Sequence, residues 1–367
     1  MNMKNYNFIL SLFFIFISTI SARQTEQVDV SKFFSLTNSP FKNEQVITDP
    51  SALCEAAKDT LKYFNDRKLF NARFVHPRDF GTHVMSSQKT KQTLEKIIKI
   101  IEEDKFRILD PEFLNKTFKF IKWSGDTKSA LKNNVVIPEA VSGRIPKGQI
   151  RLTNYAIFKT DGSYEKTDKY NCALYEVIDS SFVKSDRFKF TKQDVVAGIL
   201  YNDLYKNKIK PLVWISRDGL EDAIMQGSIV VVMPDNKKRV FNVDKSNGIA
   251  YDKVLKDLKA QKRYWYFKEI KRDQMASSNA HLNHGQAIFA GDIHHIGIGK
   301  IIAILYTNPV NKKKEIRLGV LADTGGAFLN NLYQLDYFMG IFNNKSNFYS
   351  HIRYLPNTVE AFVLASR

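Results

Sequence analysis

Three aspartates in the C-terminal third of the chain are spaced in a way that suits acid–base chemistry. Asp292 follows an apolar run, Asp323 precedes the double glycine Gly325 and Gly326, and Asp336 precedes an aromatic run. Two carboxylates held close together cannot both ionise at low cost, so the pKa of one rises, and apolar walls raise it further. A carboxylic acid still protonated near neutral pH can give its proton to a leaving oxygen.

The same spacing also suits a purely structural role. Aspartates commonly accept hydrogen bonds from turn amides, and Asp323 and Asp336 flank the turn at Gly325 and Gly326. In that interpretation the two carboxylates only shape a loop. Spacing alone leaves both interpretations open.

The elements that must position these aspartates are strands, and they follow a helical N-terminal part. Apolar periodicity predicts helices over 50–66, 89–104, 110–123, 191–207, 218–226 and 249–261. Short alternating or apolar runs predict strands over 148–159, 211–216, 228–234, 239–244, 286–292, 300–307, 315–323, 348–355 and 359–365. We therefore expect a mainly β protein with N-terminal helices, of the α+β class. Its short C-terminal strands, separated by Gly, Asn and Pro, favour a small closed barrel, with the aspartates at strand ends or on loops.

The N-terminus has the features of a secretory signal. Residues 1–22 combine Lys4, an apolar run over 8–20 and a small residue at Ala22. We expect cleavage there, with an uncleaved anchor as the alternative, followed by a polar leader over 23–48. No cysteine lies beside the cleavage site to carry a lipid. No later segment has about 18 consecutive apolar residues, so no integral membrane segment is expected after cleavage. The expected location is the periplasm or outside the cell.

Charge and cysteine content limit the partners. Lys and Arg number 55 against 38 Asp and Glu, a formal net charge of +17. Since a secretory signal makes nucleic acid a poor partner, cell-wall polymer with free carboxylates or an anionic membrane face fits better. Cys54 and Cys172 either pair or remain buried thiols, and the sequence does not decide.

No cofactor or metal is expected. His281, His284, His294 and His295 gather in the sequence, and an H-x-x-H spacing can ligate zinc. Because His294 and His295 are adjacent and no cysteine is near, a polar loop is the preferred interpretation.

Several segments resemble one enzyme family in order and approximate separation. "GDIHHIGIGKIIAI" and "LGVLADTGGAFLNNLYQLDYFMG" resemble the three-aspartate domain of the membrane-bound lytic transglycosylase A (MltA) family. Upstream, "IRLTNYAIF" is similar to the family's R-Y-T-G-Y strand, "DAIMQGS" to its Q-G-S-G segment, "NGIAY" to N-G-x-x-Y, and "RYWYF" to F-V-F-F. The resemblance covers residues 148–340. Leu329 and Asn330 stand where the family pattern has Lys and Gly.

The resemblance implies a fold of two domains. A double-psi β-barrel domain would be formed by 49–157 together with 263–367, with the three-aspartate motif at 286–340. A smaller β-rich domain would be inserted over 158–262. A peptidoglycan glycan strand would lie in the groove between the two domains, since ligand sites favour domain interfaces. We expect a monomer.

The resemblance also implies a reaction and the residues that carry it. The enzyme would cleave the β-1,4 bond between N-acetylmuramic acid (MurNAc) and N-acetylglucosamine (GlcNAc) without water, leaving 1,6-anhydroMurNAc ends. Asp336 would act as acid and then as base, Asp323 would support it electrostatically, and Asp292 would order the barrel loops. The substrate-binding set implied by the resemblance is Thr153, Tyr155, Gln226, Ser228, Asp292, Gly325 and Gly326. Two alternatives are a β-1,4 glycan hydrolase using two aspartates and a non-catalytic, expansin-like wall-binding protein.

Overall fold

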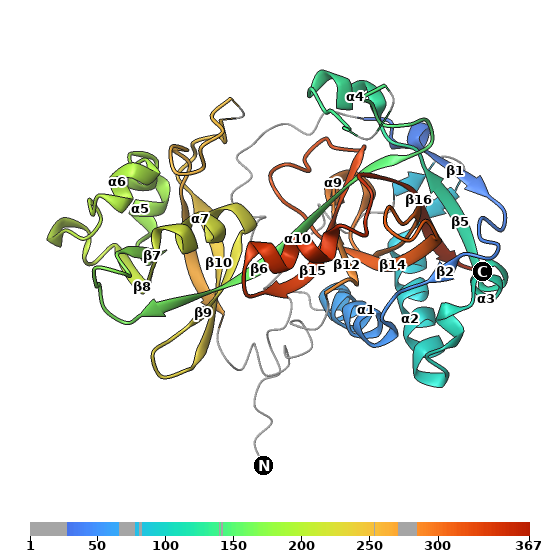
Figure 1. Ribbon diagram of the computed structural model, residues 1–367, viewed down its shortest axis with the longest axis horizontal. Helices are drawn as coiled ribbons and strands as arrows, with labels where there is room; N and C mark the ends of the chain where they lie inside the picture. The colour runs from blue at the N-terminus through green and yellow to red at the C-terminus, as the bar shows by residue number, and fades with distance from the viewer. Residues whose placement is uncertain are drawn as a thin grey trace, which may run out of the picture.

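The computed structural model describes residues 28–65, 78–80, 83–138, 140, 142–252, 254–270 and 285–367 (Figure 1). The expected signal segment, His281 and His284 lie outside the described residues. Within them, no helix is both long and apolar enough to cross a membrane.

The N-terminal part is mainly helical, as expected. Helix α1 places Leu53, Ala57 and Phe64 in the core, and α2 begins after Ser86, whose side chain accepts a hydrogen bond from the Lys89 amide. The elements are η3 (Val30–Phe33), β1 (Phe34–Thr37), β2 (Gln45–Val46), α1 (Pro50–Asn65), β3 (Arg78–Phe80), β4 (His83–Met85), α2 (Ser87–Glu103), η4 (Arg107–Leu109), α3 (Pro111–Thr117), β5 (Phe118–Trp123) and α4 (Thr127–Lys132).

The middle of the chain mixes strands with short helices. The β9–β10 hairpin, expected from its turn residues, is present as an antiparallel pair. The elements are β6 (Ile150–Ser163), β7 (Cys172–Val177), α5 (Ser180–Lys184), η5 (Asp186–Phe188), α6 (Lys192–Val196), η6 (Asp203–Tyr205), β8 (Ile209–Ile215), α7 (Arg217–Gln226), β9 (Ser228–Val232), β10 (Lys238–Ser246) and β11 (Trp265–Ile270).

The C-terminal part is β-rich. Its elements are β12 (Ile288–Ala290), α9 (Ile293–Ile296), β13 (Lys300–Thr307), β14 (Lys314–Asp323), β15 (Gln334–Phe342), α10 (Lys345–Ile352) and β16 (Thr358–Ser366). Mixed α and β structure with one large sheet agrees with the expected α+β class.

Four local predictions were wrong. The helix expected over 110–123 ends at Thr117 and continues as β5, whose Phe-x-Phe alternation suits a strand. The strand expected over 348–355 is instead the end of α10 and a turn. The helix over 191–207 shrinks to α6 and a short 3-10 turn, and the described part of 249–261 has no helix.

Most strands belong to one 14-stranded sheet that contains a closed ring. The order β16-β13-β14-β12-β15-β6 returns to its start because β6 also pairs with β16, Arg151 lying opposite Thr358. The ring mixes parallel pairs, β12 with β14 and β15 with β6, with antiparallel ones. The 14-residue strand β6 then runs on to pair with β9 (Figure 1). Strand pairing therefore closes these six strands into a ring.

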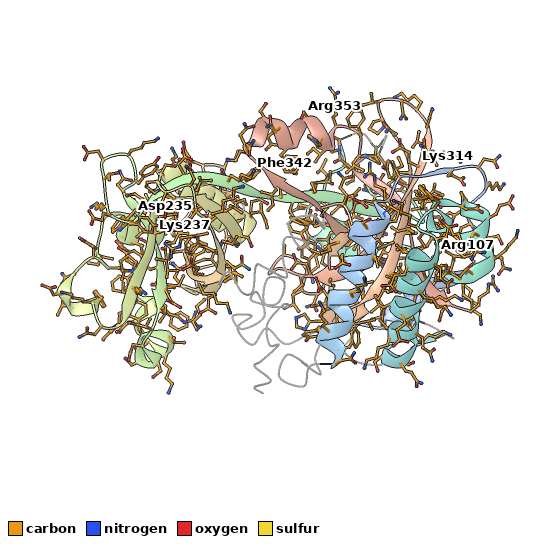
Figure 2. The ribbon with its side chains drawn as sticks, turned by 90° about the horizontal axis from the view of Figure 1, so that it is seen from below. Arg107, Asp235, Lys237, Lys314, Phe342 and Arg353 are labelled. Carbon is orange, nitrogen blue, oxygen red and sulfur yellow. The ribbon has the colours of Figure 1, made fainter. Side chains whose placement is uncertain are left out.

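Buried apolar side chains form two main clusters. One packs α1, α2 and the ring strands together, and the other packs α7 with β7 to β11. Figure 2 shows Asp235 and Lys237 of the β9–β10 turn at the opposite end of the molecule from Arg107 and Lys314. Cys54 lies in the first cluster and Cys172 in the second, and both are free thiols. The paired alternative for the cysteines is therefore wrong.

Candidate active site

Four neighbouring strands align two of the three aspartates in one row. Ala290 of β12 lies opposite Asp323 of β14 on one side and Asp336 of β15 on the other. Asp336 in turn lies opposite Thr153 of β6. The Cα atoms of the two aspartates are therefore about two strand spacings apart, roughly 10 Å, which lets their side chains approach. The loop over 324–333 carries the chain across β12, which explains the 13-residue separation.

Asp323 is buried, with 9% of its surface exposed, and is held by two hydrogen bonds. The Tyr155 hydroxyl donates to its Oδ2 at 2.7 Å, and the Thr324 amide donates to Oδ1 at 2.7 Å. Burial raises the pKa of Asp323 to about 7, although both hydrogen bonds oppose that rise by favouring the ionised form.

Asp336 is only partly buried, yet its Oδ1 is inaccessible and has no hydrogen-bond partner among the described residues. Burial raises the pKa of Asp336 to about 7, and the nearby charge of Asp323 contributes in the same direction. The Thr153 hydroxyl and the Arg151 cation act against the rise. A carboxyl group in this setting holds its proton close to neutral pH and can still release it.

A short chain of hydrogen bonds orients Thr153. Gln334 Nε2 donates to the Thr153 hydroxyl oxygen at 2.8 Å, and that hydroxyl lies 3.3 Å from the Leu335 carbonyl as a donor. Because Gln334 donates to the Thr153 oxygen, the Thr153 proton is left to face the two acceptors beside it, the Leu335 carbonyl and the Asp336 carboxyl group.

Gln334 and Arg151 were not among the residues selected from the sequence. They lie opposite each other on β15 and β6, two residues before Asp336 and Thr153, and therefore on the same face. The period-two alternation of the two strands is the signal that identifies them. Arg151 places a cation near Asp336, whereas the basic position of the family's aspartate–glycine loop is Leu329 here.

Asp292 does not join the row. It is fully buried at the start of α9, where Oδ1 accepts from the His295 amide at 3.2 Å and Oδ2 contacts His295 Nδ1 at 2.7 Å. Oδ2 also accepts from the Asn331 amide at 3.0 Å, which ties α9 to the loop between the other two aspartates. These contacts support loop ordering and leave Asp292 without access to a sugar.

The two glycines leave open space beside Asp323. Neither Gly325 nor Gly326 has a positive φ, and a Cβ at Gly326 would meet no atom within 4 Å. Backbone conformation therefore does not require glycine there. Further along the loop, Asn330 has φ +57°, a left-handed conformation in which Asn is the usual substitute for Gly. Asp323 does accept a turn amide, as the structural interpretation expected, but Oδ1 of Asp336 accepts none.

Gln226 and Ser228 flank Gly227 between α7 and β9. Gln226 Oε1 accepts a hydrogen bond from the Ala156 amide of β6 at 3.3 Å. Gly227 has φ +80°, which ends α7 and starts β9 at Ser228. Helix α7 begins after Ser216, whose hydroxyl accepts a hydrogen bond from the Gly219 amide. Gln226 and Ser228 are both partly exposed, and Gln226 contacts β6, the strand that carries Thr153 and Tyr155.

The histidine cluster forms no metal site among the residues that the structure describes. In the described part of the chain, no three His, Cys, Asp or Glu side chains come close enough together to hold a metal ion. His295 is instead bonded to Asp292.

Solved structures with the same fold are lytic murein transglycosylases. The chain aligns with E. coli MltA with bound chitohexaose at a TM-score of 0.59 and 16% identity, covering 94% of this chain and 98% of that one. A membrane-bound lytic murein transglycosylase from Agrobacterium tumefaciens aligns at 0.57 and 14%, covering 91% and 98%. MltA from Neisseria gonorrhoeae aligns at 0.55 and 14%, covering 87% and 88%.

At these identities the likeness defines the fold, which is that of the MltA lytic transglycosylases. No protein-family model matches the sequence, and no curated protein matches it either.

Proposed function

We propose that this protein is a peptidoglycan lytic transglycosylase in which Asp336 is the single acid and base. The observation that carries the proposal is the alignment of Asp336 with Asp323 across Ala290, both with a pKa of about 7, within an MltA-type fold. The substrate is the β-1,4 bond between MurNAc and GlcNAc, and the product carries a 1,6-anhydroMurNAc end.

One carboxyl group suffices because the nucleophile belongs to the substrate. Asp336 gives its proton to the glycosidic oxygen as the C1–O bond breaks and positive charge develops on the MurNAc ring. The ionised Asp336 then takes the proton of the MurNAc 6-hydroxyl, whose oxygen forms the new bond to C1. No water is consumed, and Asp336 ends protonated as it began.

Asp323 supports this cycle through its charge. When ionised it favours the protonated form of Asp336 and stabilises the positive ring in the transition state. Arg151 opposes the first effect and keeps the pKa of Asp336 low enough for proton release. We assign it the basic position that Leu329 leaves unfilled in the aspartate–glycine loop.

The sugar is bound by groups on both sides of β6. We assign hydrogen bonding to Thr153, Gln226 and Ser228, and steric room to Gly325 and Gly326. Tyr155 acts mainly through Asp323, since its hydroxyl is bonded there. Asp292 orders the loops and does not touch sugar.

The two apolar clusters correspond, in this proposal, to two domains. The six-stranded ring is the double-psi barrel, and the residues over 158–262 with the start of β11 form the inserted domain, the glycan lying in a groove between them. Tyr264, Tyr266 and Phe267 pack in the second cluster, which moves the boundary slightly beyond 262. We further propose a monomer that carries a cleaved signal and acts in the periplasm or after export.

Digestion of purified sacculi tests the proposal. Wild-type protein is expected to release fragments with anhydro ends, one water lighter than hydrolysis products, and Asp336→Asn none. Asp168→Asn is the matched control, because Asp168 is exposed on a loop and its carboxylate accepts no hydrogen bond among the described residues. Reducing ends would establish the two-aspartate hydrolase instead. Unchanged solubilisation by Asp336→Asn, with pelleting on sacculi lost in Thr153 or Gln226 variants, would establish a binding protein.

A further inference from the structure

Arg263 lies two residues before the start of β11, and its guanidinium is stacked on aromatic rings without a partner anion among the described residues. Its guanidinium carbon lies 5.2 Å from the ring centre of Tyr251 and 5.9 Å from that of Trp265. Its Nε is inaccessible and has no acceptor, and no hydrogen bond or ion pair joins the guanidinium to any described residue. Burial lowers the pKa of Arg263; Tyr251 counteracts that effect, and no carboxylate of the described residues does.

A second arginine stacked on a ring, Arg239, shows the carboxylate partner that Arg263 lacks among the described residues. Arg239 lies over Phe241 at 4.9 Å, and its guanidinium binds both carboxylate oxygens of Glu269 at 2.6 Å. A planar guanidinium with free N–H groups is suited to bind a carboxylate through two parallel hydrogen bonds. Arg263 therefore contacts two aromatic rings, and no carboxylate binds its guanidinium among the residues that the structure describes.

Two buried amide side chains fix the geometry around Arg263. Asn247 accepts hydrogen bonds from the Tyr264 amide at 3.0 Å and the Ile249 amide at 3.3 Å, and donates to the Lys262 carbonyl at 3.1 Å. Gln261 accepts from the Asp252 amide at 2.9 Å and donates to the Asp252 carbonyl at 2.7 Å. The segment carrying Tyr251 is thereby tied to the segment carrying Arg263 before any ligand binds.

The strand register relates this site to the aspartate row. β9 starts at Ser228, which pairs with Asn242 of β10. β10 and β11 continue past that start, because Ser246 pairs with Trp265. Neither strand is covered by β9 over this extension.

The extension is level with the catalytic row on β6. β6 and β9 run parallel with Phe158 opposite Ile229, so Ile157 is level with Ser228, and Thr153 is level with the end of the extension. Three strand spacings separate β6 from β11, roughly 14 Å. A four-residue peptide spans up to about 13 Å, which is the reach of a stem peptide attached to a MurNAc bound beside Asp336.

We propose that Arg263, with Tyr251 and Trp265, forms a binding site for a carboxylate on the peptide of the substrate. The inference rests on the proposed function for its substrate class. This site would bind the peptide of the substrate and is separate from the residues that bind and cleave the sugar.

Binding without turnover tests the site. Asp336→Asn protein serves as the binder, and the probes are a soluble glycan–peptide fragment from sacculi, the same fragment with its carboxylates converted to amides, and peptide-free glycan. In this background Arg263→Met is expected to raise the Kd for the carboxylate fragment about tenfold, or about 1.4 kcal/mol. The Kd values for the amidated fragment and the peptide-free glycan stay unchanged.

Controls separate the site from general effects. Measurements at a fixed ionic strength of about 0.15 M limit attraction by the net positive charge. Arg107→Met is the matched control, since Arg107 also lies over a ring, Phe113 at 4.8 Å, at the far end of the molecule (Figure 2). Arg263→Lys keeps the charge without the planar fork and is expected to retain part of the affinity. Thermal unfolding verifies that each variant is folded.

Three results would overturn the inference: equal losses for all probes in a folded Arg263→Met protein, no loss for any probe, or an Arg263-dependent affinity for inorganic phosphate with none for the carboxylate fragment. The outcome is independent of the reaction. If wild-type protein releases anhydro products but Arg263→Met does not change binding, only the carboxylate site is refuted. If no anhydro products form, the proposed function is refuted, while the binding data still test Arg263.

Discussion

The hydrogen bond from Tyr155 to Asp323 offers a sharp test of how the aspartate pair works. Tyr155→Phe removes the hydroxyl that donates to Asp323 Oδ2 at 2.7 Å. The substitution keeps the aromatic ring, which packs against Phe338 with ring centres 5.1 Å apart. The perturbation is therefore confined to one proton donor of a buried carboxylate.

The size of the effect follows from the energy of that hydrogen bond. A hydrogen bond to an ionised group contributes about 1.5–3 kcal/mol, so its loss raises the pKa of Asp323 by about one to two pH units. With both aspartates near pKa 7, about half of the singly protonated molecules hold the proton on Asp336, as the reaction requires. A rise of one pH unit at Asp323 cuts that share to about one in eleven, and kcat/KM at pH 7 falls about fivefold; two units give about fiftyfold.

The sign of the pH dependence is also determined. Activity falls at low pH when Asp323 becomes protonated and at high pH when Asp336 becomes ionised. Because the substitution raises only the pKa of Asp323, the acid limb of the kcat/KM profile moves to higher pH and the alkaline limb does not.

The assay is the rate of release of anhydro fragments from sacculi between pH 5 and 9. Tyr264→Phe is the matched control, since its hydroxyl donates to the Ala173 carbonyl at 3.2 Å in the other apolar cluster. An unchanged profile in Tyr155→Phe, or a loss of equal size at every pH, would refute the coupling of Tyr155 to the reaction through Asp323.

Four further predictions concern charge and backbone conformation. Burial raises the pKa of Asp336 from its ordinary 3.8 to about 7, so the folded state binds this proton more tightly than the unfolded state and loses stability as pH rises from 4 to 7. Asp336→Asn should therefore be more stable than wild type at pH 8, by up to about 4 kcal/mol and with a higher unfolding temperature, and as stable as wild type at pH 4. Arg151→Met removes a cation that lowers the pKa of Asp336, and the alkaline limb of the rate profile should move to higher pH. Lys192→Met removes one of two cations bound to buried Glu221 and should destabilise by about 3 kcal/mol in denaturant unfolding. Asn330→Val should cost about 1–2 kcal/mol in the same assay because of the positive φ, whereas Asn330→Gly is tolerated.

Local patterns in the sequence predicted much of the architecture. Helices α1 and α2 and the strands β6, β9, β10, β13, β14 and β16 formed where apolar periodicity placed them. Their residues alternate or repeat with the period of the element they form, so no distant contact was needed to identify them. The fold resemblance drawn from the aspartate motif agrees with the solved structures that share the fold.

Elements that depend on distant partners were misjudged. Residues 118–123 form β5 because they pair with β16 on one side and β1 on the other, neither of which is near in sequence. The segment over 249–261 has an amphipathic pattern, yet its described part is irregular, and side chains distant in sequence bind its backbone: Lys192 donates to the Leu258 carbonyl and Arg217 to the Lys259 carbonyl. Such tertiary contacts override helical propensity.

The sequence by itself determined the chemical types available to this protein: three aspartates, a glycine pair between two of them, and strands of alternating pattern to carry them. Only the tertiary structure decided their environments. The row through Ala290 depends on parallel and antiparallel pairing between β14, β12 and β15. The pKa of Asp336 rises to about 7 because the surrounding elements bury it. Burial and strand register both depend on contacts between segments far apart in the chain. For this reason two residues of the same type have different surroundings: Asp292 accepts a hydrogen bond from the Asn331 amide, whereas Oδ1 of Asp336 has no partner among the described residues.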